Sequence, residues 1–275
     1  ILQLCADDFG LSEGIDRGIL ALIADGRLSA TSCMVAGPAL ATHAGELMAL
    51  ADRADIGLHL TFTDLAPLGA MPGLMPGGVI PALSALIVRA FTLRLDYAEI
   101  SAEIRRQIAR FEAVFGRPPD FVDGHQHVHL LPVFRRALWA CFDDGTLPAT
   151  TAVRNCHEPA ITIVRRGVEV NKTLFIAALS LGMPLAARRR GVPINDSFRG
   201  VTAFDPSRPY DFRPFLTGPG RRPLAMCHPG MPGFDPHPTD VIAAARQREY
   251  AYFSSDQFLG DLDRAGMCIG RHPRS

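Results

Sequence analysis

The sequence contains no apolar run of the roughly 20 residues that a helix needs to cross a bilayer. The longest apolar stretch, residues 174–187, ends at three consecutive arginines, residues 188–190. This pattern predicts a buried or interface helix rather than a membrane span. An interface helix at this position is consistent with a homodimer.

The sequence also lacks a cysteine framework. Its six cysteines are scattered along the chain, and none belongs to a CxxC motif. Several lie in apolar runs, where a free thiol behaves as a small hydrophobic side chain. Disulfides are rare in reducing compartments, so this usage predicts a cytoplasmic protein.

No repeat, low-complexity tract or linker divides the chain. Its 275 residues, 48% of them hydrophobic, are enough for an ample core, and we expect a single domain over residues 1–275. The 28 basic residues are balanced by 28 acidic ones. A neutral chain argues against a nucleic-acid partner, because such a partner requires a basic surface.

Short apolar runs alternate with helical patterns in the first part of the chain. Residues 1–6, 30–36 and 55–60 are typical of buried strands, and residues 14–26 and 40–51 have the periodicity of helices. This β-α-β-α-β order predicts an α/β fold with a parallel sheet and right-handed crossovers.

The stretch Asp-Gly-His-Gln-His-Val-His at residues 123–129 holds three of the nine histidines. Read as a strand, it points Asp123, His125, His127 and His129 to one face, with neighbours roughly 6.5–7 Å apart. Two adjacent members, or one member with ligands from elsewhere, can hold one metal ion. The alternative is a polar strand end whose histidines only form hydrogen bonds.

Polar residues follow the apolar runs at their expected carboxyl ends: Asp7, Asp8, His59, His125, Arg154 and His228. In a parallel barrel these ends converge on the catalytic face. One carboxylate with two imidazoles makes a three-ligand metal site that leaves positions open for water. A straight strand would point Asp7 and Asp8 to opposite faces, but Gly10 permits a bend that brings both into one cavity.

Four motifs in this order resemble those of the YdjC-like carbohydrate deacetylases, which include chitooligosaccharide and hopanoid-biosynthesis-associated deacetylases. The motifs are ADDFGLS (6–12), GLHL (57–60), DGHQHVH (123–129) and CHP (227–229). The resemblance runs from the amino terminus to about residue 135 and resumes at His228. Residues 155–220 contain no motif that we can place.

The resemblance implies a divergent TIM-like (β/α) barrel of mostly parallel strands, with the active site at their carboxyl ends. It implies one divalent metal ion, magnesium or zinc, with Asp8, His59 and His125 as its ligands. By position, Asp7 corresponds to the catalytic base and His228 to a catalytic acid.

The chain departs from the family pattern at two positions within the third motif. Gly124 and Gln126 stand where the family often has serine and histidine. On a straight strand both would face away from His125, so we expect little effect on the metal.

Substrate-binding or orienting residues are more weakly indicated. Arg154 is expected to orient Asp7 or the substrate, and His127 is either an alternative ligand or a hydrogen-bond donor to one. A Pro- and Gly-rich stretch, residues 66–81, is expected to cover the pocket as a flap. Apolar contacts to the sugar are expected from Phe9, Phe62 and Met71.

The resemblance implies a metal-dependent hydrolase that removes the N-acetyl group from an amino sugar, free or lipid-linked, giving acetate and a free amine. Two alternatives stay open: a metal-dependent phosphoesterase, which usually requires two ions, and a non-catalytic sugar-binding protein of the same fold. By ligand type, two imidazoles suit zinc or another transition metal better than magnesium.

Overall fold

Seven parallel strands form one curled sheet. The computed structural model describes residues 1–205, 207–218 and 220–272. The strands lie in the order β5-β4-β3-β2-β1-β7-β6, and every neighbouring pair is parallel. Their bounds are β1 (Gln3–Phe9), β2 (Ala30–Cys33), β3 (Asp55–Leu60), β4 (Phe121–Gly124), β5 (Ala152–Val153), β6 (Ser197–Arg199) and β7 (Pro223–Cys227). The predicted α/β class with a parallel sheet is confirmed.

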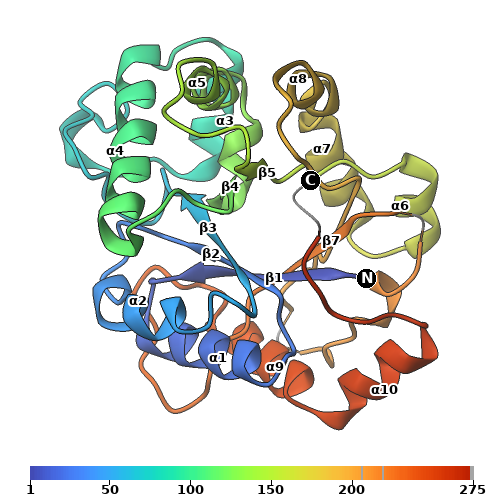
Figure 1. Ribbon diagram of the computed structural model, residues 1–275. Helices are drawn as coiled ribbons and strands as arrows, with labels where there is room; N and C mark the ends of the chain where they lie inside the picture. The colour runs from blue at the N-terminus through green and yellow to red at the C-terminus, as the bar shows by residue number, and fades with distance from the viewer. Residues whose placement is uncertain (206, 219, 273–275) are drawn as a thin grey trace.

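Helices cover the outside of this sheet. In Figure 1, α1, α2, α9 and α10 lie along one side of the strands, and α3, α4, α5, α7 and α8 lie along the other. Their bounds are α1 (Glu13–Ala24), α2 (Leu40–Met48), α3 (Leu83–Phe91), α4 (Tyr97–Phe115), α5 (Pro132–Asp143), α6 (Ala160–Arg166), α7 (Val170–Leu179), α8 (Met183–Arg190), α9 (Ala243–Phe253) and α10 (Asp256–Arg264).

The central strands are apolar because they are buried on both faces. All seven residues of β1 are buried, as are all six of β3 and all five of β7. A parallel strand covered by helices on one side and by the barrel interior on the other has no solvated face, so its sequence does not alternate. The polar residues of these strands are therefore confined to their ends.

The two edges of the curled, TIM-like sheet approach each other at a single bridge, between β5 and the chain just before β6. Val153 of β5 pairs in parallel with Ile194, and its N–H donates to the carbonyl of Pro193 at 2.9 Å. Beside this bridge the side chain of Asn195 accepts from Asn155 N at 2.8 Å and donates to Asn155 O at 2.7 Å. These bonds give the edge backbone the partners that a barrel normally supplies.

The apolar stretch at residues 174–187 is two helices rather than one. By length and composition alone, Val170–Arg190 is the one described segment that qualifies as a membrane-spanning candidate. The chain turns between α7 and α8 at Gly182, which has φ of +85°. The 10 residues of α7 span about 15 Å, half of a bilayer core of about 30 Å.

Candidate active site

The side chains at the strand ends line one cavity of about 320 Å³. Asp7 and Asp8 come from the end of β1 and His59 from the end of β3, whereas His125 and His228 immediately follow β4 and β7. The remaining lining comes mainly from α3, α7 and the chain before α9. The fold thus gathers residues that are more than 200 positions apart.

A bulge in β1 turns two consecutive carboxylates toward this cavity. The pairing with β2 shifts register between Ala6 and Phe9, and Asp8 has φ of +73°. Aspartate is among the few residues that adopt this left-handed backbone, and the bulge cancels the alternation of a regular strand. The change of direction that we predicted at Gly10 therefore begins two residues earlier, at Asp8 itself.

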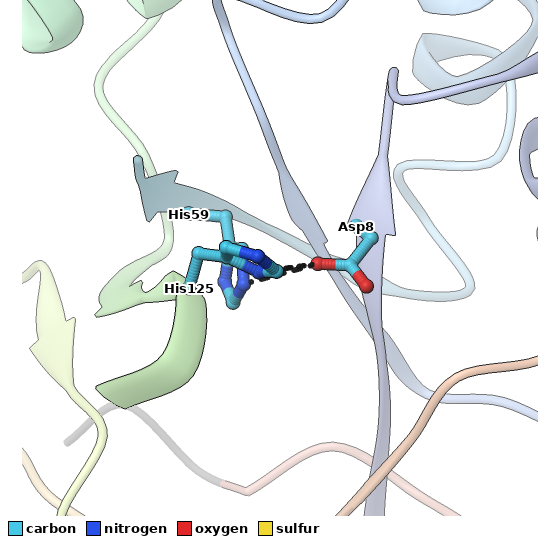
Figure 2. Close-up of side chains that lie close together, drawn as sticks. All are labelled: Asp8, His59 and His125. Atoms are coloured by element: carbon cyan, nitrogen blue, oxygen red, sulfur yellow. Dashed lines mark hydrogen bonds and ion pairs between the residues drawn. The ribbon is translucent and has the colours of Figure 1, made fainter. Parts of the chain in front are cut away.

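Asp8, His59 and His125 point toward one another (Figure 2). Oδ1 of Asp8 lies 3.3 Å from Nε2 of His59 and 3.0 Å from Nδ1 of His125. One ligand atom from each residue lies within 4.8 Å of the other two. Nε2 of His59 is buried and lacks a hydrogen-bond partner of good geometry. This donor set and its unsatisfied nitrogen fit a divalent metal ion.

A second carboxylate holds each imidazole from its other nitrogen. Nδ1 of His59 lies 2.7 Å from Oδ1 of Asp123, and Ser32 donates its hydroxyl to the same oxygen. Nε2 of His125 lies 2.8 Å from Oδ2 of Asp64. The Asp123 side chain is fully buried, whereas that of Asp64 is 36% exposed. Such bonds fix the tautomer and orientation of metal-binding histidines.

The predicted strand over residues 123–129 is wrong. Strand β4 ends at Gly124, and the next residues, His125–Leu130, form tight 3₁₀ turns. Gln126 and His127 have φ of +52° and +61°. Two consecutive left-handed residues reverse the chain direction, so the polar side chains of the motif do not share one face.

The other two histidines of the motif lie outside the triad and have partners of their own. His127 lines the cavity separately, with Nδ1 3.7 Å from Sγ of Cys156 and its ring edge against Phe198. His129 is buried, and its Nε2 lies 3.1 Å from the carbonyl of Arg154. Burial lowers the pKa of His127 well below its usual value and that of His129 to about 4, so both are neutral.

The two departures from the family pattern affect the site differently. Gln126 was predicted to face away from His125, but it contacts the carboxylate that holds His125. It donates to Oδ2 of Asp64 at 3.2 Å and accepts from the Thr63 hydroxyl at 3.0 Å. Gly124 lies where the turn folds back closely, since a Cβ there would be 3.0 Å from the backbone nitrogen of His129. Gln126 therefore belongs to the network that positions His125.

Arg154 joins the predicted base to the carboxylate that holds His59. Its Nη1 and Nη2 donate to the two oxygens of Asp7 at 2.7 and 2.6 Å, and Nη2 also lies 2.6 Å from Oδ2 of Asp123. Cys5, Asp7 and Asp123 are also spaced as metal ligands. The guanidinium occupies that space, with Nη2 3.1 Å from the sulfur of Cys5, so we assign no ion there.

Arg246 of α9 holds the other oxygen of Asp8, a role that no motif indicated. Its Nη2 donates to Oδ2 of Asp8 at 2.7 Å, and its Nε donates to Asp240 at 2.9 Å. Burial disfavours the Asp8 carboxylate, but Arg246 and His125 outweigh that effect and hold its pKa well below the usual range. The ligand is therefore fully ionised.

The same carboxylates favour the protonated form of the two imidazoles. Burial disfavours the His59 imidazolium, but Asp123 and Asp8 outweigh that effect and raise its pKa to about 10. The pKa of His125 is also raised, because Asp8 and Asp64 outweigh its burial. A metal ion must displace these protons, which makes its binding pH-dependent.

His228 lines the cavity outside the triad. Its backbone N–H donates to a carboxylate oxygen of Glu249 at 2.5 Å. Its ring and that of Phe204 are nearly perpendicular, with their centroids 5.1 Å apart. Its Nδ1 is buried without a hydrogen-bond partner among the described residues. Burial, opposed by Asp8 and Asp7, lowers the pKa of His228 to about 4. The imidazole is therefore neutral at neutral pH.

The predicted apolar contacts to the sugar are corrected by the structure. Phe9, Phe62 and Met71 are 0%, 2% and 3% exposed and belong to the hydrophobic core. None of them lines the cavity. Their apolar character is explained by packing, so they present no surface to a ligand.

The predicted flap is likewise fastened away from the cavity. Within residues 66–81, backbone N–H groups donate to Glu103 and Glu99 of α4 at 2.8–3.2 Å. No residue of this segment lines the cavity. The neighbouring helix α3 forms part of the cavity wall instead.

The fold and the triad together define a class of protein: a (β/α) barrel whose strand ends bring together one aspartate and two histidines with a spacing that fits a metal ion. The model of the family described as "YdjC-like protein" matches residues 1–264. The chain belongs to the YdjC-like family.

Two relatives are named chitooligosaccharide deacetylase. The protein from Serratia marcescens is 42% identical over 133 residues, which is 48% of this chain and 51% of the relative. The protein from Yersinia pestis (strain Pestoides F) is 38% identical over 164 residues, 59% of this chain and 64% of the relative. The aligned part of the chain thus spans about half to two thirds of each relative.

A solved structure shares the fold over nearly the whole chain. It is a protein from Enterococcus faecalis V583 named for cellobiose-phosphate cleavage, with a TM-score of 0.67 and 20% sequence identity. The match covers 98% of this chain and 95% of that protein. At this identity the likeness supports the barrel fold alone.

Proposed function

We propose that this protein is a metal-dependent N-deacetylase, which removes the acetyl group from an N-acetylated amino sugar, free or lipid-linked. The observation that carries the proposal is the Asp8, His59 and His125 triad beside an arginine-held carboxylate, Asp7, in one cavity. The names of the chitooligosaccharide deacetylases in the same family support a sugar substrate.

Asp8, His59 and His125 would hold one divalent ion. When bound, such an ion lowers the pKa of a water molecule and polarises an amide carbonyl. Two imidazole nitrogens favour zinc or another transition metal, because magnesium prefers oxygen ligands. Arg246 keeps Asp8 ionised and oriented for this role.

Asp7 serves as the general base in this proposal. Arg154 donates to both of its oxygens, so the carboxylate has one orientation. Oδ1 also accepts from the Cys5 thiol at 3.6 Å, whereas Oδ2 retains a lone pair. Asp7 takes a proton from the water whose oxygen attacks the acetamide carbon. Because Asp7 precedes the ligand Asp8 in sequence, the base is adjacent to the metal site.

His228 serves as the general acid. The C–N bond breaks as the amine nitrogen gains a proton, and the acetyl carbon keeps the oxygen of the water as acetate. Since the pKa of His228 is lowered to about 4, its imidazole is neutral before turnover. The attacking water has two protons, of which one goes to Asp7 and the other passes through His228 to the amine nitrogen. The unpartnered Nδ1 of His228 is available to carry it.

Acetate release from N-acetylglucosamine oligomers, with and without added zinc, tests the proposal. Asp7→Asn should keep metal binding by calorimetry and lose at least ~100-fold in acetate release, the usual contribution of a general base. Asp25→Asn, at an exposed position after α1, is the matched control and should change neither. Full turnover by Asp7→Asn would contradict the role of Asp7.

The alternatives receive less support. A two-ion phosphoesterase would need a second cluster, and among the described residues the other candidate cluster is filled by Arg154. A sugar-binding protein without catalysis has no use for a base beside a metal site.

A cytoplasmic location is proposed because all six cysteines are free thiols, which reducing compartments favour. Cell fractionation would test this location.

A further inference from the structure

His228 differs from the triad histidines in what holds its imidazole ring. Each imidazole of the triad is held by a carboxylate through its second nitrogen. Nδ1 of His228 is buried and has no such partner among the described residues. The ring packs beside Phe204, whose side chain carries no hydrogen-bonding group. The position of the His228 imidazole therefore depends on packing and on where the backbone places its Cα atom.

Glu249 of α9 holds that backbone. A carboxylate oxygen of Glu249 accepts from the N–H of His228 at 2.5 Å, and Glu249 is only 2% exposed. Burial raises the pKa of Glu249 to about 7, although the His228 N–H and Arg246 favour the ionised form. The carboxyl group has an acceptor oxygen in both protonation states, so the bond to His228 does not require ionisation.

The turn after His228 is attached to the same helix. The N–H of Gly230 donates to the backbone carbonyl of Arg246 at 3.1 Å. Pro229 lies between the two attached residues and favours an extended backbone at His228. Residues 228–230 are therefore bound to α9 at two points, and α9 sets the place of His228.

Helix α9 is itself well anchored. Its buried face carries Glu249 and, one turn further on, Tyr252 and Phe253. Tyr252 donates its hydroxyl to Asp261 of α10 at 2.7 Å, and the rings of Phe253 and Phe258 pack with their centroids 5.0 Å apart. A side chain on such a rigid element can hold its partner in one place.

We infer that Glu249 is a positioning residue for the general acid, because it holds the backbone of His228 in the place from which the imidazole can reach the leaving amine. This inference rests on the proposed deacetylase function. Glu249 does not line the cavity, so it does not touch the substrate itself. A displacement of a catalytic group by about 1 Å can slow a reaction by about 100-fold, so the loss of this one bond should be measurable in kcat.

The test measures acetate release from N,N′-diacetylchitobiose by the zinc-loaded protein. Glu249→Met removes the acceptor at similar volume and should lower kcat by about tenfold or more, with KM within about twofold of wild type. Glu249→Gln retains an acceptor oxygen and should keep kcat within about threefold of wild type. Gln247→Met, at an exposed position of the same helix, is the matched control and should change neither constant.

A double-mutant cycle shows whether Glu249 acts through His228. In the His228→Ala protein the acid is already absent, so adding Glu249→Met should lower kcat by less than about a further twofold. Zinc affinity, measured by calorimetry, should be the same for Glu249→Met and wild type, because Arg246 still holds Asp8. A residue that only stabilised the fold would not show this dependence on His228.

Thermal unfolding checks that each variant folds. Should Glu249→Met unfold, Glu249→Asp takes its place in the cycle, because it keeps the carboxyl group but withdraws the acceptor by one methylene group. The same loss in kcat and the same dependence on His228 are expected.

The outcomes separate this inference from the proposed function. Equal kcat for Glu249→Met and wild type, additive losses in the cycle, or a fall in zinc affinity would each overturn the inference and leave the deacetylase proposal standing. Absence of acetate from the zinc-loaded wild-type protein would instead overturn the proposed function. Full turnover by His228→Ala would overturn the assignment of the general acid, and this inference with it.

Discussion

The two histidines of the triad are held in opposite ways. His59 lies on β3, and its partner Asp123 is fully buried and paired with Arg154. His125 begins a turn whose next two residues are left-handed, and its partner Asp64 is 36% exposed. One side of the candidate metal site is therefore fixed by the barrel core. The other side is set by a loop whose charges are screened by water.

Removing Arg154 should have the largest effect, a loss of stability, because Arg154 pairs with the buried carboxylates on the His59 side of the site. Arg154→Met leaves the buried carboxylates of Asp7 and Asp123 without their shared cation, and should lower the free energy of unfolding by about 3–5 kcal/mol. Urea unfolding measures this loss. Arg213→Met, which removes an exposed ion pair, is the control and should leave the unfolding midpoint unchanged. A loss below ~1 kcal/mol for Arg154→Met would show that the network is not a stabilising unit.

Asp123→Asn should have the next largest effect, a loss of affinity for zinc. Nδ1 of His59 would lose its charged partner while the bonds of Arg154 to Asp7 remain. Affinity for zinc should fall by about 10–100-fold, the usual cost of losing such a contact. Isothermal titration calorimetry measures it. An unchanged affinity would mean that Asp123 serves only to pair with Arg154.

The pH dependence of metal binding tests the side of the site that contains His59 and Asp123. The pKa of His59 is raised to about 10, so its imidazole is protonated in the metal-free protein at every pH below that value. Each displaced proton should strengthen zinc binding about tenfold per pH unit between pH 6 and 8. Titrations at several pH values give the slope, and Asp123→Asn should make it shallower. A slope near zero would contradict the assigned protonation of His59.

Asp64→Asn should have the smallest effect. The amide still accepts a hydrogen bond from Nε2 of His125, and the site of the change is partly solvated. We expect zinc affinity to fall by less than about 10-fold, below the loss for Asp123→Asn. The same calorimetric titration measures both. A larger loss for Asp64→Asn than for Asp123→Asn would reverse the comparison between the two sides.

The sequence pattern could predict a parallel sheet and the gathering of the triad, for one physical reason, whereas the barrel was implied by the resemblance to the YdjC-like family. Buried parallel strands appear as apolar runs, and their carboxyl ends meet at one face of the sheet. Polar residues that directly follow such runs, as Asp8 and His59 do, are therefore expected in one cavity even without knowledge of the loops.

The turn after Gly124 could not be predicted in this way. Gln126 and His127 have positive φ without being glycines, so nothing local in the sequence signals the reversal. Asp64 and Arg246 reach the site from a loop and from α9, and only the folded chain shows their contacts. They share no motif with the residues that they hold.

The sequence could not show which apolar residues pack in the core and which line the cavity. Phe9 and Phe62 lie close in sequence to the triad yet pack inward, whereas Phe175 lies far from any motif and lines the cavity. The hydrophobic effect is non-directional, so it sets how much apolar surface is buried but not which side chain faces a ligand.

The proposed base Asp7 and the proposed metal ligand Asp8 are consecutive residues, and the bulge at Asp8 turns both toward one cavity. Their Cα atoms are about 3.8 Å apart by covalent geometry, and no rearrangement of helices or loops can separate them. Substitutions on α3 and α7, which line the cavity, can therefore change its shape while the two carboxylates stay consecutive on one strand. Substrate specificity in this barrel can therefore change without loss of the proposed arrangement of Asp7 and Asp8.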